Sequence, residues 1–121
     1  MNDAREIAMP VSDWLLVDAT IDNSVSDAAV DGDDPRVETG RRIRKAGWAA
    51  AASHPNREEG PAGWPPVTAD ITPDLLTTDW SFILAELVRW AAVSEQVGML
   101  DERDEATRVA ERLRLRLADR P

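Results

Sequence analysis

Residues 78–118 read TDWSFILAELVRWAAVSEQVGMLDERDEATRVAERLRLRLA and carry the strongest structural signal of this chain. In the first half, apolar residues recur at the three- and four-residue spacing of a helix, and Gly98 is placed to end it. A second helix is expected over residues 101–118, capped by Asp101, with acids in its first turn and arginines near its end. Because only Gly98-Met99-Leu100 separates the two helices, they are expected to form an antiparallel αα-hairpin.

Three shorter stretches upstream are expected to be β-strands. Residues 14–21, WLLVDATI, are almost continuously apolar, which is typical of a buried strand. Residues 48–52, WAAAA, are bounded by a glycine and a proline and are interpreted as a strand, although a continuing helix fits the same residues. Residues 67–72, VTADIT, alternate apolar and polar, which predicts a half-buried strand that Pro73 limits to a sheet edge.

One further helix is expected between the first two of these strands. Asp34 and Pro35 have the pattern of a helix start, with Asp34 as the N-cap and Pro35 at a position that needs no N–H. Gly47 is expected to end this helix as its C′ residue.

The order of these elements, β-α-β-β-α-α, predicts an α+β fold for a single domain over residues 1–121. It has a small three-stranded sheet, one crossover helix and the C-terminal hairpin. Residues 1–12 are expected to be a flexible tail, and residues 22–34 an acidic loop.

The composition excludes several classes of chemistry. The chain has no cysteine, which rules out disulfides, thiolate zinc sites, iron–sulfur clusters and a cysteine nucleophile. No stretch approaches the roughly 20 apolar residues of a transmembrane helix, and the N-terminus does not have the pattern of a signal peptide. We therefore expect a cytoplasmic protein with no membrane partner, and its preference for arginine over lysine points to GC-rich coding and a bacterial or phage source.

The net charge of −9 is unevenly distributed along the chain. Residues 1–34 carry −8, residues 35–57 carry +5, residues 58–86 carry −6, and the remainder is neutral. The acidic total disfavours nucleic acid as a direct partner. The basic run RRIRK at 41–45 is able to contact phosphate, but the acidic flanks predict that it pairs within the protein instead.

Two patterns have some features of ligand sites. Asp27–Glu38 has the glycine and the final glutamate of a calcium loop at the right offsets, but Ala29 stands where an oxygen ligand is required. His54, in the loop over residues 53–66, has two glutamates nearby and is a candidate general base. No second histidine, nucleophile elbow or phosphate loop accompanies it. We therefore expect no catalytic residue, no metal and no cofactor.

The helix that starts near Thr78 carries more apolar surface than one contact face requires, including Phe82, Trp90 and Val93. A sheet on one side and the last helix on the other would cover these side chains; otherwise they form an exposed patch that binds a partner. Trp64, in the proline-rich loop, either packs within that loop or serves as a similar anchor. The candidate partner-binding residues are Phe82, Trp90, Val93, Trp64 and Leu115.

These features favour a small non-enzymatic protein-interaction or regulatory module that acts through an apolar helical surface. Its partner is another protein or a second copy of the chain in a homodimer. The alternative from another class is an acidic inhibitor that mimics nucleic acid, as phage anti-defence proteins do. A hydrolase that depends on His54 or on a metal ion is the least favoured interpretation.

Overall fold

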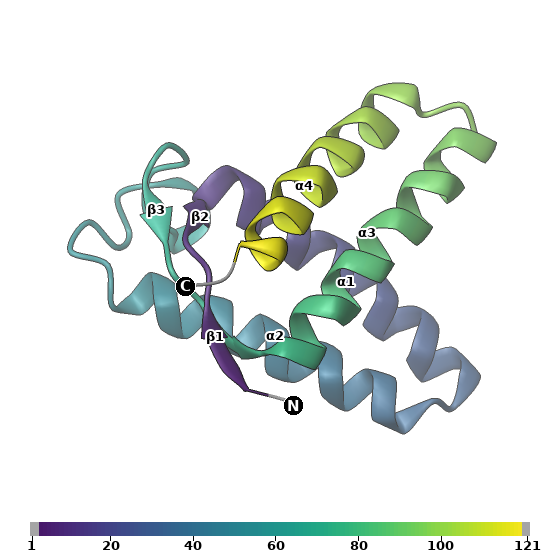
Figure 1. Cartoon of the computed structure of the whole chain (residues 1–121), viewed down its shortest axis with the longest axis horizontal. Helices are drawn as coiled ribbons and strands as arrows, with labels where there is room; N and C mark the ends of the chain where they lie inside the picture. Colours follow the sequence, from purple (N-terminus) through teal and green to yellow (C-terminus); the bar gives the residue numbers. More distant parts are fainter. Residues whose placement is uncertain (1–2, 120–121) are drawn as a thin grey trace.

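The computed structural model describes residues 3–119, which form two helical hairpins and a short β-ribbon (Figure 1). In this part of the chain the fold is mixed α+β and mostly helical. Residues 1–2 and 120–121, which the predicted tail and domain include, lie outside the described residues. The helices are α1 (Val11–Asp31), α2 (Asp34–Ala52), α3 (Thr77–Gln96) and α4 (Leu100–Ala118), with a short 3-10 turn at Pro61–Gly63.

The N-terminal segment pairs with the chain that precedes α3. The strands are β1 (Ala4–Glu6), β2 (Met9–Pro10), β3 (Asp70–Ile71) and β4 (Asp74–Leu76). β1 pairs antiparallel with β4, and β2 pairs antiparallel with β3. These two two-stranded sheets replace the predicted three-stranded sheet.

The two pairs share one register. Ala4 lies opposite Leu76 and Met9 lies opposite Ile71, so the pairing continues without a shift from one pair to the next. The ladder is interrupted beside Pro73, which accepts a hydrogen bond but has no N–H to return. The two pairs therefore form one interrupted antiparallel ribbon. Of the strand predicted over residues 67–72, only the part at β3 pairs in this way.

The predicted flexible tail is wrong for residues 4–12. Ile7, Met9 and Val11 are buried in the core. The guanidinium group of Arg5 donates hydrogen bonds to carbonyl oxygens in the last turn of α4, including that of Leu117 at 2.8 Å. The N-terminal segment therefore closes the core and also satisfies carbonyl groups that a helix end leaves without partners.

The strand predicted over residues 14–21 is helical, as is most of the predicted acidic loop. Both belong to α1, whose buried residues include Trp14, Val17 and Ile21 at the spacing of one helix face. The helix ends at Gly32, which adopts a left-handed φ of +72°. The short apolar run concealed this period because it contains only two turns of the helix.

α2 differs from its prediction at both ends. Asp33, not Asp34, is the N-cap, and its carboxylate accepts the Arg36 N–H at 3.3 Å. Gly47 does not end the helix, and the strand predicted over residues 48–52 forms the last turns of α2. Gly47 has a packing role instead, because a Cβ atom at this position would lie 2.1 Å from Nε1 of Trp14.

The C-terminal αα-hairpin is confirmed. α3 and α4 pack along each other, and Gly98 turns the chain between them with a φ of +80°. Asp101 lies in the first turn of α4, whereas Met99 occupies the N-cap position that Asp101 was expected to fill.

The core joins both hairpins and the ribbon. Trp14 of α1 and Trp80 of α3 meet edge to face, with ring centroids 6.3 Å apart. Trp80 also donates from Nε1 to the carbonyl oxygen of Arg5 at 2.9 Å, which ties β1 to α3. Within residues 3–119, no helix combines the length and apolar character needed to span a bilayer.

Candidate functional site

A groove with a volume of about 460 Å³ lies between α1 and the turn of the α3–α4 hairpin. Figure 1 shows this end of the hairpin projecting from the rest of the molecule. Apolar side chains from all three helices line the groove. They are Leu16 and Ala19 of α1, Trp90, Val93 and Val97 at the end of α3, and Met99 and Ala106 around the start of α4.

Helical periodicity brings the α3 side chains into this groove. Trp90, Val93 and Val97 are separated by three and four residues, so they lie on one face near the end of α3. Val97 keeps 64% of its surface exposed and Met99 keeps 47%. The groove therefore contains apolar surface that residues 3–119 leave open to solvent.

Trp90 forms a fixed wall of the groove. Its indole N–H donates to Ser24 Oγ at 2.9 Å, and that hydroxyl donates to the Thr20 carbonyl at 3.1 Å. The Arg89 guanidinium group lies over the indole ring, 4.6 Å from its centroid. Contacts on one edge and one face hold the side chain, so a ligand would meet a preformed surface.

A buried carboxylate, four residues before Trp90 on α3, links the two hairpins. Glu86 of α3 accepts hydrogen bonds from Arg36 of α2 at 2.8 Å and from Arg89 at 3.2 Å. Burial on its own would raise the pKa of Glu86, but hydrogen bonds from the guanidinium groups of Arg89 and Arg36 outweigh burial, so its pKa is lowered. Arg89 also reaches Asp27 of α1 at 3.4 Å, so the cluster connects three helices.

The rim of the groove is acidic. Glu102 and Glu105 of α4 line it, and neither has an ion-pair partner within residues 3–119. No arginine or lysine is among the described residues that line it. A ligand with cationic groups beside an apolar surface would complement this arrangement.

The structure brings together only part of the predicted partner-binding set. Trp90 and Val93 lie in the groove, whereas Phe82 is half-buried against the core. Leu115 is 70% exposed but is not among the residues that line the groove.

Of the two roles considered for Trp64, packing of the proline-rich loop is the one that the structure supports. The Trp64 side chain is 3% exposed and lies against Trp48, with ring centroids 4.0 Å apart. The indole therefore fixes the proline-rich loop onto α2.

The groove residues that the sequence did not predict come mainly from α1. Leu16, Thr20 and Asn23 share one helix face, but the interpretation of this segment as a strand and a loop separated them. The exposed residues Val97 and Met99 have a clearer signal, because they flank the predicted hairpin turn at Gly98.

The basic run of α2 pairs within the protein in part: Arg42 and Arg44 do so, whereas Arg41 and Lys45 are exposed and have no ion-pair partner among the described residues. Arg42 donates two hydrogen bonds to the buried Asp79, the shorter at 2.6 Å. Arg44 pairs with Asp18 at 3.1 Å and with Asp22 at 2.8 Å. These two arginines therefore connect α2 to α3 and to α1.

The segment with calcium-loop offsets does not form a loop that encloses an ion. Asp27 lies within α1 and pairs with Arg89, Asp33 caps α2, and Glu38 lies within that helix. Among residues 3–119, no group of three or more histidine, aspartate or glutamate side chains lies close enough to hold a metal ion.

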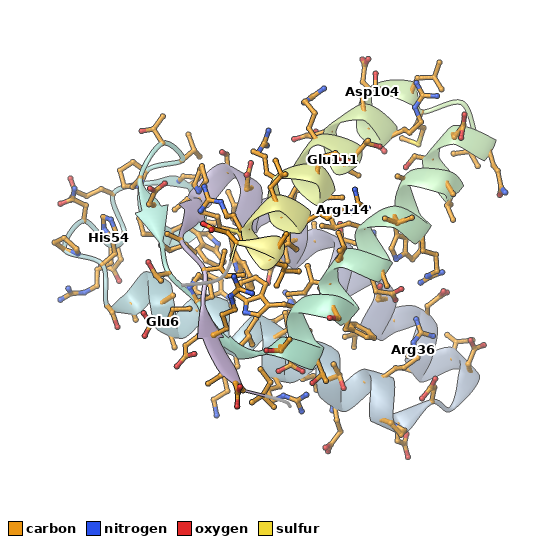
Figure 2. All side chains as sticks on the ribbon, in the orientation of Figure 1. Glu6, Arg36, His54, Asp104, Glu111 and Arg114 are labelled. Atoms are coloured by element: carbon orange, nitrogen blue, oxygen red, sulfur yellow. The ribbon has the colours of Figure 1, made fainter. Side chains whose placement is uncertain are left out.

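His54 lies far from the groove, at the opposite end of the molecule from Asp104 (Figure 2). Its Nδ1 atom accepts the Asn56 N–H at 3.0 Å, which leaves the proton of the neutral ring on Nε2. Glu58 and Glu59 are exposed, and within residues 3–119 neither bonds to His54. His54 does line a second hollow, which runs between α2 and the strand segment 70–76.

Carboxylates without ion-pair partners in the described residues occur on several elements, and two of them, Glu6 and Asp74, lie opposite each other in the ribbon. Examples are Glu6 of β1, Glu38 of α2, Glu58 and Glu59 of the loop, Asp74 of β4, and Glu102 of α4.

Comparisons of the chain with protein-family models, with curated proteins and with solved structures found no match.

Proposed function

We propose that this protein is a non-enzymatic interaction module that binds an amphipathic helix of another protein in the groove between α1 and the α3–α4 hairpin. The observation that carries the proposal is the exposed apolar surface of Val97 and Met99 in a groove with the fixed wall of Trp90. Apolar grooves between helices bind partner helices whose anchors recur at three- and four-residue spacing.

Charge defines the partner helix further. Because Glu102 and Glu105 lie at the rim without ion-pair partners in the described residues, we expect lysine or arginine beside the apolar face of the bound helix. Rim charges mainly affect the association rate and its dependence on salt. Binding should therefore weaken as ionic strength rises.

A designed peptide tests this proposal without a known partner. The probe is a helical peptide with leucines at i, i+3, i+4 and i+7 and lysines on both flanks, titrated into ¹⁵N-labelled protein. We expect the largest amide shifts at residues 90–106 and along the groove face of α1. A peptide with glutamates in place of the lysines should bind about tenfold or more weakly.

Two valines provide a matched pair of variants. Val97→Lys places a cation in the groove, whereas Val30→Lys makes the same change at an 89% exposed site near the end of α1. Lysine suits the C-terminal end of a helix at both positions. Val97→Lys should abolish binding, and Val30→Lys should leave the dissociation constant within about twofold.

Three results would overturn the proposal. The first is no binding of the lysine peptide at low millimolar concentration, and the second is equal binding by the Val97→Lys variant. The third is a concentration-dependent dimer in sedimentation velocity that Val97→Lys dissociates, which would assign the groove to a second copy of the chain.

A further inference from the structure

The outer edge of the strand segment 70–76 has backbone groups that point away from β1 and β2, the strands with which it pairs in the described residues. The Ile7 N–H donates to the Pro73 carbonyl at 3.3 Å, and the Val11 N–H donates to the Ala69 carbonyl at 2.8 Å. Residues of an antiparallel pair direct their backbone groups alternately towards and away from the partner. Ala69 and Pro73 therefore face the N-terminal strands, and the outward-facing groups belong to the alternate residues of the segment. Those residues are Asp70, Thr72 and Asp74.

Thr72 is the centre of this free edge. Within residues 3–119, neither its N–H nor its carbonyl oxygen has a hydrogen-bond partner, and its side chain is exposed. An exposed strand edge of this kind is a template for pairing with another extended chain.

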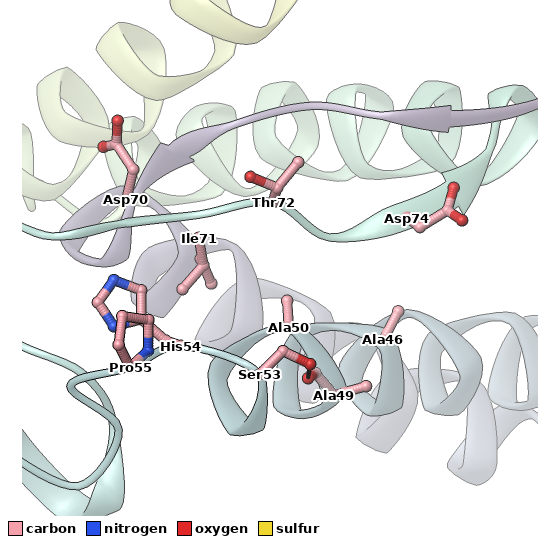
Figure 3. A pocket seen from close by; sticks show the side chains of 10 residues that line it. All are labelled: Ala46, Ala49, Ala50, Ser53, His54, Pro55, Asp70, Ile71, Thr72 and Asp74. Carbon is pink, nitrogen blue, oxygen red and sulfur yellow. Dashed lines mark hydrogen bonds between the residues drawn. The ribbon is translucent and has the colours of Figure 1, made fainter.

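A trough runs along this edge. Figure 3 shows the strand segment alongside α2, with β1 and β2 on its other side and His54 at one end. The trough has a volume of about 410 Å³, and its α2 wall is formed by small residues, Ala46, Ala49, Ala50 and Ser53. A smaller hollow of about 150 Å³ shares Ala46 and Asp74 with it and extends it towards the start of α3.

The length of the trough and the small side chains on its α2 wall leave room for an extended chain. Small side chains on α2 leave the space beside the strand unfilled over the length of residues 70–76, about 20 Å at the rise of a β-strand. A strand placed there would pair with the free edge on one side and rest on the alanines of α2.

Charge specifies the occupant. Asp70 and Asp74 are exposed, share one face of the strand because they are four residues apart, and have no ion-pair partner in the described residues. The one arginine of the trough, Arg42, is bonded to Asp79. Cross-strand pairs of opposite charge stabilise a sheet.

We propose that the 70–76 edge binds an extended segment of a partner protein as a third strand. The segment carries lysine or arginine at positions i and i+4, opposite the two aspartates, and a small polar residue at i+2, opposite Thr72. Residues i+1 and i+3 face the alanines of α2 and are apolar. This site is separate from the α1–α3–α4 groove and does not depend on the function proposed for that groove.

The test uses a peptide with the core Lys-Val-Thr-Val-Lys, blocked at both ends. Titrated into ¹⁵N-labelled protein, it should shift the amide signals of Asp70, Thr72 and Asp74 and slow their hydrogen exchange. The peptide with both lysines changed to glutamate should bind about threefold to tenfold more weakly.

Two backbone-methylated peptides separate strand addition from simple charge attraction. The N–H of the central threonine would face the free edge, so its methylation should weaken binding about tenfold or more. The N–H of the adjacent valine would point away from the edge, so methylation there should change binding by less than about twofold. Equal loss from both peptides, or no loss from either, would overturn the proposal.

Protein variants give a second line of testing. Thr72→Pro removes the outward N–H, which takes part in no hydrogen bond within residues 3–119, and should abolish binding. The double variant Asp70→Lys with Asp74→Lys should no longer bind the lysine peptide and should bind the glutamate peptide instead. Val97→Lys should bind the strand peptide as the unmodified protein does. No shift at residues 70–74 with the unmodified protein at millimolar peptide would reject the site.

Discussion

Trp14 and Gly47 show how one small residue positions the centre of this molecule. Trp14 is fully buried, and its Nε1 atom has no hydrogen-bond partner among the described residues. The indole reaches this position because Gly47 lets it lie against the backbone of α2. Gly40 has a similar role about two turns earlier, where an added Cβ would meet Val25 at 2.3 Å. Both glycines are used for close helix packing rather than for chain reversal.

Gly47→Ala should destabilise the protein, although alanine favours helices over glycine by about 1 kcal/mol. The added methyl group must displace the Trp14 ring, and overpacking of this kind costs about 1–3 kcal/mol. Chemical denaturation followed by tryptophan fluorescence measures the free energy of unfolding. Ala49→Gly, on the exposed face of the same helix, is the control and should lose about 1 kcal/mol. A gain in stability for Gly47→Ala would contradict the contact.

At the scale of the elements, arginine–carboxylate pairs connect helices that are far apart in sequence. Arg112 of α4 binds Asp13 of α1 through two hydrogen bonds at 2.8 and 2.9 Å. Arg42 makes the same kind of paired contact from α2 to Asp79 of α3. The planar guanidinium group suits such two-point contacts, which fix orientation as well as distance.

Glu86→Gln should lower the free energy of unfolding at neutral pH and make it depend less on pH in the acidic range. Because the pKa of Glu86 is lowered by folding, its contribution is present above the ordinary pKa and is lost as pH falls through the folded value. Loss of the charged acceptor for Arg36 and Arg89 should cost about 1–3 kcal/mol at pH 7.

Denaturant titrations between neutral pH and about pH 3 would measure this effect, since the loss should develop below about pH 4.3, the usual pKa of glutamate. Glu95→Gln is the control on the same helix, because Glu95 is exposed and pairs only at the surface. If the free energy of unfolding changed with pH in the same way for Glu86→Gln and for the unmodified protein, Glu86 would not be the source of this pH dependence.

At the scale of the whole molecule, the N-terminal segment holds the two hairpins together. It pairs with the strand segment before α3, sends Ile7 and Met9 into the core, and places Arg5 at the end of α4. A two-stranded ribbon is marginal by itself and depends on such packing. The free edge of residues 70–76 is a consequence of this arrangement, because the first strand of the chain occupies only one side.

Deletion of residues 1–10 should destabilise the fold strongly. Loss of Ile7 and Met9 from the core removes two buried apolar side chains at about 1.5–3 kcal/mol each, in addition to the ribbon pairing. Thermal unfolding by circular dichroism measures the change. Deletion of residues 1–3 alone, which removes the Asp3 carbonyl that accepts two hydrogen bonds from Thr77, is the comparison and should lower the midpoint less. An unchanged midpoint for the longer deletion would contradict this structural role of the N-terminal segment.

Local patterns predicted the elements that depend on local interactions. The α3–α4 hairpin follows from two amphipathic stretches and the glycine between them, and its bounds agree with prediction within about two residues. α1 was missed because its apolar run is short and its polar second half has few apolar positions to reveal the helical period. The end of α2 was misplaced because Gly47 is also the usual signal for a helix end.

The amino-acid sequence by itself determined the helical hairpin at the C-terminus, the pairing of part of the basic run, Arg42 and Arg44, with the protein's own acids, and an apolar excess on α3. Only the tertiary structure decided which of those apolar side chains stay exposed, because burial depends on where α1 and the N-terminal segment pack. It also decided that Gly47 makes room for the Trp14 ring, and that one edge of residues 70–76 has no partner strand among the described residues. Contacts between residues far apart in the chain set both outcomes, and neither leaves a periodic signal in the sequence.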